Sequence, residues 1–303
     1  FLKKLLDLHI MKIVTKLFLI IFLTASIQHH SYAEGNLKKD LNKISQYVHE
    51  LIPGDGITEF DFKSKESREP SFSILAVRDI AKSERSNFFT QFSLQNNDVG
   101  SDERYIANLG FGYRGLSQDE STMIGLNGFY DRELTEDHER LGIGMELRGS
   151  LFEFNINKYF RLSKAKNVSG TEEQALGGTD YNARGPLPHM PWAKFSWTGY
   201  NHEKDEAASH TRGNIYAVEM ALTPYLQFDF GRDIGHGFDG PTNVANLTYK
   251  YPPNNNITTL VDGLWDSNIF EDQSSMKGHL SDKVKRNNVI TVEIQGAVII
   301  TSQ

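Results

Sequence analysis

The sequence predicts an all-β protein, a twelve-stranded antiparallel β-barrel that crosses a membrane. Three observations predict it. Along residues 56–251, apolar side chains alternate with small or polar ones in one segment after another, which is the period of a β-strand. Most of these segments have the roughly 9–11 residues with which a tilted strand spans a bilayer. Short and long connections alternate between them, as they do in membrane barrels.

The N-terminal residues predict an exported protein. From Met11 onward, a basic start and a short apolar run lead to the small residues Ser31 and Ala33, which is the pattern of a secretory signal peptide. The apolar run is well short of the ~20 residues that a spanning helix needs. We therefore expect residues 11–33 to be a signal peptide that is cleaved between Ala33 and Glu34.

One short amphipathic helix is predicted over residues 37–52, because leucine, isoleucine and valine recur there at helical spacing. The helical period then ends and the strands begin. The predicted domains are upstream sequence foreign to the native protein (1–10), the signal peptide (11–33), a short periplasmic helical segment (34–54), the barrel (55–251) and a post-barrel linker without a passenger domain (252–303).

Twelve segments have the strand pattern. In "RYIANLGFGYRG" (104–115), one parity is Tyr105, Ala107, Leu109, Phe111 and Tyr113, and the other is small or polar. The predicted strands are 56–63, 71–79, 87–95, 104–113, 122–131, 139–148, 150–161, 179–187, 192–201, 213–222, 225–231 and 243–251.

The connections support a barrel whose two ends differ. They are long after the seventh, ninth and eleventh strands, as in "LSKAKNVSGTEEQALGG", and short after the sixth, eighth and tenth, as in "GS" and "TP". Outer-membrane barrels have short periplasmic turns and long outside loops. A soluble β-sandwich shows the same alternation of side chains, but the leader, the strand length and the loop pattern favour the membrane.

In such a barrel the polar parity lines the lumen. Its charged residues mix both signs, which favours a mutually paired network over a pore lining or a ligand site. The predicted lumen-facing residues are Arg114, Asp131, Glu146, Arg148, Glu153, Lys194, Glu219, Asp229 and Lys250.

Composition excludes some functions and leaves others open. A formal net charge of -7 gives no basic footprint for nucleic acid, and the absence of cysteine excludes thiolate metal sites. Two polar loops collect histidine and acidic residues: one holds Asp233, His236 and Asp239, and the other holds His202, Glu203, Asp205 and His210. A metal site or a hydrolase could use them, but solvated loops have the same composition. We expect no cofactor and no enzymatic activity.

Several ordered motifs resemble a known family. "RYIANLGFGYRG", "GLNGFYDREL", "HERLGIGMELRG" and "FNINKYFRLS" follow one another, and "DYNARGPLPHMP" and "VKRNNVITVEI" come later. Together they resemble the transmembrane domain of inverse autotransporters, the intimin and invasin family, over residues 56–294.

The resemblance implies a twelve-stranded outer-membrane barrel whose C-terminal linker turns back and threads the lumen to the cell surface. It also implies that the lumen charges contact this linker. Leu247, Tyr249 and Tyr251 resemble the strand signal that the outer-membrane assembly machinery reads. The implied partners are outer-membrane lipid, that machinery, periplasmic chaperones and a receptor on host cells or other bacteria.

The predicted function is therefore a translocator of the inverse autotransporter type in a Gram-negative outer membrane. It would export its own C-terminal segment and take part in adhesion or invasion. The chain ends soon after residue 294, which leaves three alternatives: a barrel-only porin, an adhesin acting through its surface loops, or a truncated remnant of a longer adhesin. A barrel-embedded hydrolase and a soluble lectin-like sandwich are further rivals.

Overall fold

The computed structural model describes residues 53–66, 68–99, 102–205, 211–235, 240–271, 275–294 and 297–299. Nearly all of them belong to one compact unit, Asp55–Gln303. The predicted signal peptide, the cleavage position between Ala33 and Glu34, and the predicted helix over 37–52 lie outside the described residues. Within the described part of the chain, no helix is long and apolar enough to cross a membrane.

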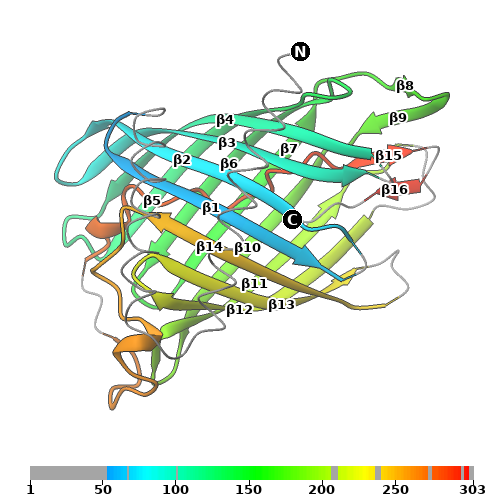
Figure 1. Ribbon diagram of the computed structural model, residues 1–303. Coiled ribbons are helices and arrows are strands. Elements are labelled where there is room, and N and C mark those ends of the chain that lie inside the picture. The colour runs from blue at the N-terminus through cyan, green and yellow to red at the C-terminus, as the bar shows by residue number, and fades with distance from the viewer. Residues whose placement is uncertain are drawn as a thin grey trace. The chain divides into compact units, whose positions relative to one another are not determined.

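Twelve antiparallel strands close into a barrel (Figure 1), so the predicted fold class is confirmed. In barrel order after β1 (Gly56–Lys65) come β14 (Thr242–Tyr251), β13 (Leu226–Gly235), β12 (Thr211–Thr223), β11 (Met190–His202), β10 (Gly178–Leu187), β7 (Glu153–Arg161), β6 (Glu139–Gly149), β5 (Thr122–Glu133), β4 (Asp102–Leu116), β3 (Ser86–Val99) and β2 (Ser71–Lys82).

The first and last strands close the barrel by pairing with each other. The register runs from Thr58 opposite Tyr251 to Lys65 opposite Val244. Closure leaves no unpaired barrel edge, which is what a strand structure needs inside a bilayer. This pairing excludes the soluble sandwich, which has two separate sheets.

The two ends of the barrel differ as the connections predict. At one end, here called the short-turn end, residues 83–85, 117–121, 150–152, 188–189 and 224–225 join the strands. The opposite end carries the connections 162–177, 203–210 and 236–241, and we call it the long-loop end (right side of Figure 1).

Strand parity separates the two faces of the wall. In β4 the side chains of Leu109, Phe111 and Tyr113 point outward and are about half exposed, whereas Arg114 is fully buried inside. Many outward side chains of other strands are similarly exposed apolar groups, among them Leu126, Ile143, Met145 and Phe230. An apolar outer belt around a polar interior is the inverse of a soluble protein and suits lipid.

Inward glycines in β4 make room for aromatic rings in the lumen. A Cβ atom on Gly110 would lie 2.2 Å from the ring of Phe129, and one on Gly112 would lie 2.3 Å from the ring of Phe89. Both phenylalanines are buried. The alternating glycines in "LGFGYRG" therefore relieve crowding on the inner face.

A small second sheet stands at the long-loop end, and the sequence did not predict it. Its strand order is β16 (Ala297–Ile299), β15 (Val292–Ile294), β9 (Thr171–Ala175) and β8 (Lys166–Val168). Strands of three to five residues are too short for a readable period. In addition, the pairing of β15 with β9 joins segments far apart in the sequence.

The chain after β14 first stays at the short-turn end. It forms two short 3-10 helices, η1 (Leu260–Asp262) and η2 (Lys277–His279). Lys277 forms an ion pair with Glu84 of the β2–β3 turn, and the backbone N–H of Met276 donates to the carbonyl of Glu120 in the β4–β5 turn. From η2 the chain enters the barrel.

Candidate functional site: the occupied lumen

Residues 280–294 run through the barrel from the short-turn end to the long-loop end. We call this segment, from Leu280 to Ile294, the lumen linker. Successive residues of the linker contact successive positions along β3. Asn87 Nδ2 donates to the carbonyl of Leu280 at 3.1 Å, and the N–H of Val284 donates to Gln91 Oε1 at 2.8 Å. At the far end Val292 pairs with Ala175 of β9. Figure 1 shows this path within the ring of strands. The resemblance implied a C-terminal linker that starts near Pro252 and threads the lumen. The threading is confirmed for residues 280–294, whereas residues 257–271 stay outside the lumen at the short-turn end.

Wall side chains bind the main chain of the lumen linker as well as its side chains. Arg114 Nη1 donates to the carbonyls of Leu280 (3.1 Å) and Asp282 (2.5 Å). Further donors to linker carbonyls are Asn157 to Lys285 (3.0 Å), Arg140 to Asn287 (2.8 Å) and Asn108 to Asn288 (3.0 Å). These donors satisfy polar backbone groups that an extended chain away from water would otherwise leave unpaired.

Asp131 is the centre of an ion cluster that joins the linker to the wall. This fully buried carboxylate accepts from Arg140 of the wall (Nε, 2.9 Å) and from Arg286 of the linker (Nη2, 2.6 Å). The guanidinium of Arg286 also lies 4.3 Å from the centroid of the Phe129 ring. The carboxylate of Asp131 thus has two cationic partners, and one of these cations also lies against an aromatic ring. Such pairing offsets the cost of burying the charges.

A second network links the strands on the other side. Glu153 accepts from Arg184 and from Lys194 (2.7 Å), and Arg148 lies 3.0 Å from it. Arg184 also forms an ion pair with Glu219 at 3.0 Å, and Glu219 pairs with Lys285 of the linker at 2.8 Å. The linker is therefore held by charged groups from two opposite sectors of the wall.

All nine residues predicted to face the lumen lie on the inner side with polar partners. Arg114 and Glu146 bond each other at 2.6 Å. Lys250 and Asp229 both contact Gln227, at 2.7 and 2.6 Å. Lys194 and Lys250 are less buried than the others, with side chains 32% and 28% exposed.

The sequence interpretation missed the uncharged residues that hold the linker. Gln91, Asn108 and Asn157 lie on the inward parity of their strands, and that parity was the available signal. Arg140 and Asp180 were missed because they stand near strand ends, where the period is weakest.

Apolar clusters pack against the linker at three heights. Leu280 packs with Met123 and Met276 near the short-turn end, and Val284 packs with Phe89 and Phe129 in the middle. At the long-loop end Val289, Ile290 and Val292 pack with Val99, Ile106 and Ala175.

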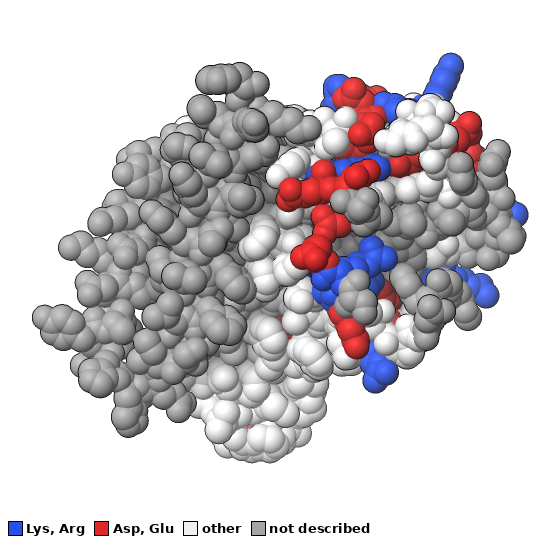
Figure 2. All heavy atoms as spheres, turned by 45° about the vertical axis from the view of Figure 1, so that its right-hand side comes forward, with Lys and Arg blue, Asp and Glu red and all other residues white. Residues whose placement is uncertain are grey.

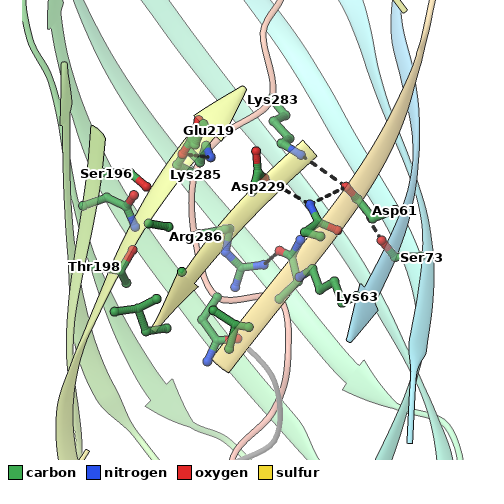
Figure 3. Close-up of a pocket in the computed structure, with 18 of the residues that line it drawn as sticks. Asp61, Lys63, Ser73, Ser196, Thr198, Glu219, Asp229, Lys283, Lys285 and Arg286 are labelled. Carbon is green, nitrogen blue, oxygen red and sulfur yellow. Dashed lines mark hydrogen bonds and ion pairs between the residues drawn. The ribbon is translucent and has the colours of Figure 1, made fainter. Parts of the chain in front are cut away.

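The linker does not fill the lumen evenly. A cavity of about 200 Å³ lies between it and the wall of β1 and β10–β14. In Figure 3, Lys283 faces Asp61 and Lys285 faces Glu219, while Ser196 and Thr198 line the opposite rim. The polar lining can hold several water molecules, so the lumen is tight on one side of the linker and roomy on the other.

At the long-loop end four buried residues tie the small sheet to the barrel. Arg104 of β4 binds Glu173 of β9 with both Nη atoms, and its Nη1 lies 3.5 Å from Glu133 Oε2. His138 Nε2 lies 2.9 Å from Glu173 Oε1. Burial alone would raise the pKa of Glu173, but hydrogen bonds from His138 and Arg104 and the charge of Arg104 lower it to about 2.

This group also offers a potential metal site. Glu133, His138 and Glu173 present ligand atoms within 4.8 Å of one another. The guanidinium of Arg104 already supplies positive charge between the two carboxylates. We therefore interpret the group as an ion-pair cluster.

The two loops with histidine and acidic residues do not assemble a catalytic group among the described residues. Asp233 pairs with Lys65 at 2.7 Å and accepts from Tyr200 at 3.0 Å, while Glu203 pairs with Lys158 and Asp205 with Arg161. His210, His236 and Asp239 lie outside the described residues.

The three residues of the predicted assembly signal end the last strand. Leu247 stands opposite Phe62 and Tyr251 opposite Thr58 of β1. Tyr249 is only 4% exposed and packs near the rings of Phe60 and Tyr225.

Comparison with known proteins now identifies the family. The family model of the inverse autotransporter β-domain matches residues 23–288. The chain belongs to this family. Intimin of Escherichia coli O157:H7 is 27% identical over 214 residues, which cover 66% of this chain and 22% of intimin. Invasin of Yersinia enterocolitica is 29% identical over 155 residues, 48% of this chain and 18% of invasin.

Two further comparisons agree. The putative attaching and effacing protein homolog of Escherichia coli K12 is 31% identical over 134 residues, which cover 43% of this chain and 42% of the homolog. A solved chain described under "Unveiling the Mechanism Behind the in-meso Crystallization of Membrane Proteins" has the same fold, with a TM-score of 0.64, 22% identity, and coverage of 79% of this chain and 100% of its own. The matched region is thus about a fifth of the curated intimins, and the protein is an outer-membrane barrel of the inverse autotransporter type.

Proposed function

We propose that this barrel anchors in the outer membrane and exports its own C-terminal segment to the cell surface. The observation that carries the proposal is the continuous path of the lumen linker from η2 at the short-turn end to β15 at the long-loop end. The proposal takes folding and assembly as the energy source for export.

The orientation follows from the connections. Because short turns face the periplasm and long loops face outward in outer-membrane barrels, we assign the short-turn end to the periplasm. The linker then enters from the periplasm and leaves at the cell surface. Figure 2 displays the long-loop end, where acidic and basic side chains lie side by side next to an uncharged flank.

Many of the hydrogen bonds between the barrel wall and the linker would also suit a passing chain of different sequence. Asn87, Asn108, Asn157, Arg114 and Arg140 all donate to main-chain carbonyls of the linker. Every residue of a passing chain offers such a carbonyl, so these contacts can re-form as the chain advances. The specific ion pairs of Arg286 and Lys285 would then set where it stops.

We further propose that the exported segment serves adhesion or invasion, because relatives of this chain are named intimin and invasin. Its partner would be a receptor on host cells or other bacteria. Assembly would use outer-membrane lipid, periplasmic chaperones and the outer-membrane assembly machinery, which would read Leu247, Tyr249 and Tyr251 at the end of β14.

Surface labelling of intact cells tests export. Three variants carry the same epitope tag: after Gln303, in the loop 164–170, or in the β4–β5 turn 117–121 as a periplasmic control. We expect antibody to label the first two tags on intact cells and the third only after permeabilisation. A labelled loop with a protected C-terminal tag would refute export and favour a porin-like or remnant barrel. Labelling of the turn tag would reverse the orientation.

A further inference from the structure

The segment that follows β14 presents large apolar side chains to solvent at the short-turn end. We call residues 257–271 the post-barrel lobe. Figure 1 shows it in orange at the lower left, projecting past the wall of β12 and β13. Its exposed side chains are Val261 (71%), Leu264 (70%), Trp265 (67%), Ile269 (58%) and Phe270 (40%). A loop that met only water would not gather so many large apolar groups.

The lobe is fixed to the barrel. At the β10–β11 turn, the backbone N–H of His189 donates to the carbonyl of Ile269 at 2.7 Å, and the N–H of Asp266 donates to the carbonyl of His189 at 2.9 Å. The imidazole of His189 stacks on Trp265 with ring centroids 4.6 Å apart, and Trp192 Nε1 donates to the carbonyl of Leu264 at 3.1 Å. The apolar groups are therefore held outward by a defined structure.

The charged groups of the lobe point to an apolar partner. Its sequence has no lysine or arginine. Its acidic side chains bind within the lobe: Asp262 accepts from the N–H and hydroxyl of Thr259, Glu271 accepts from Thr258, and Asp266 accepts from the N–H of Asn268. Basic residues that could draw the lobe to anionic headgroups are absent, so its attraction has to come from buried apolar area.

The lobe is continuous with the lipid-facing surface. The β6–β7 turn exposes Leu151 (50%) and Phe152 (47%) at the same end. A Cβ atom on Gly185 of β10 would lie 2.7 Å from the carbonyl oxygen of Leu151, so this turn lies against the strand that leads to His189. Apolar side chains thus extend from the outer belt of the barrel, along its rim, to the lobe.

We propose that the post-barrel lobe inserts Val261, Leu264, Trp265 and Ile269 into the headgroup–acyl boundary of the adjoining phospholipid leaflet. Tryptophan and aliphatic side chains favour this boundary. The lobe is then a membrane anchor placed just ahead of the lumen linker. The inference rests on the proposed function only for naming the leaflet as the periplasmic one.

Site-directed spin labelling tests the insertion, because the chain has no native cysteine. Single variants L264C and I269C carry a nitroxide in nanodiscs of phosphatidylcholine. L126C, on the outer face of β5, is the lipid control, and K164C, in the exposed connection after β7, is the water control. We expect L264C and I269C to collide more often with oxygen than with a water-soluble nickel complex, as L126C does. Collision ratios equal to that of K164C would overturn the proposal.

Native fluorescence covers the case in which labelling disturbs the lobe. Brominated phosphatidylcholine should quench the wild-type emission more than that of W265F, and equal quenching in both would contradict insertion. Labels that are water-exposed in nanodiscs but shielded from both reagents in native outer membranes would indicate a protein partner instead, which also refutes the lipid anchor. Neither measurement involves export, so the surface-tag experiment can fail or succeed independently.

Discussion

A single carboxylate at the middle of the lumen, Asp131, holds two guanidinium groups that belong to different parts of the chain. Arg140 comes from the neighbouring strand and Arg286 from the linker. All three side chains are almost fully buried. Buried ions are stable only while they are paired, so the linker contributes to the electrostatic balance of the barrel itself.

Replacing Asp131 should therefore cost more than replacing a surface carboxylate. In D131N two buried cations lose their common partner, and we expect a loss of about 3 kcal/mol in the free energy of unfolding in urea. The matched control is D137N, whose exposed carboxylate pairs with Arg132. That change should cost far less, because water screens an exposed ion pair. Equal losses in the two variants would show that the Asp131 cluster is solvated.

A second residue-scale prediction concerns Gly110. A Cβ atom there would overlap the buried ring of Phe129, so G110A should destabilise the barrel by about 1–3 kcal/mol through overpacking. Replacing the ring with a smaller aliphatic side chain in the double variant G110A/F129L should recover part of that loss. In the control G170A, the added Cβ atom would have no atom within 4 Å, so this change tests backbone strain without crowding. Lack of any recovery would contradict the steric explanation.

Glu173 gives a pH dependence with a definite sign. Its folded pKa of about 2 lies below the ordinary value of 4.5. The stabilisation is therefore complete above pH 4.5 and is lost as the pH falls towards 2. We expect amide protection of β9 and β15 to stay constant from pH 7 to 5 and to drop below pH 4.5. In E173Q this acid-dependent drop should vanish, and a drop that persists would assign it to another group.

Elements longer than a few residues were predictable because their period is readable. Each of the twelve predicted strands overlaps a barrel strand, and the ends differ by a few residues. The seventh begins at Glu153 and not at residue 150, because the N–H of Gly149 donates to the carbonyl of Phe152 and closes a turn there. The short strands β8, β9, β15 and β16 form one sheet because β15 of the linker pairs with β9 of the loop after β7.

The pairing of β15 with β9 can be broken without touching the barrel. In V292P the proline removes an N–H and restricts the backbone opposite Ala175. We expect trypsin to cleave the loop at Lys164 or Lys166 faster in V292P than in the β-compatible control V292T. Both variants should keep the gel mobility of a folded barrel. Equal cleavage rates would mean that other contacts of the loop, such as those of Glu173 with Arg104 and His138, suffice to hold it.

At the scale of the whole molecule, the linker decides whether the barrel is a pore. Three apolar clusters pack against it, and the cavity beside it measures about 200 Å³. We expect low conductance for the full chain in planar bilayers and a conductance at least several times higher after deletion of residues 277–294. A control with the deletion 297–303 should conduct like the full chain. High conductance of the full chain would favour the passive porin.

The sequence by itself determined the strand count, the two faces of the wall, the difference between the barrel ends and the family, because period, loop length and ordered motifs are local properties of the chain. Only the tertiary structure decided which polar side chains hold the linker, that Arg286 shares Asp131 with Arg140, and that β15 adds to β9. It also exposed the apolar side chains of the post-barrel lobe. The linker contacts join residues more than a hundred positions apart, and such contacts leave no periodic signal in the sequence.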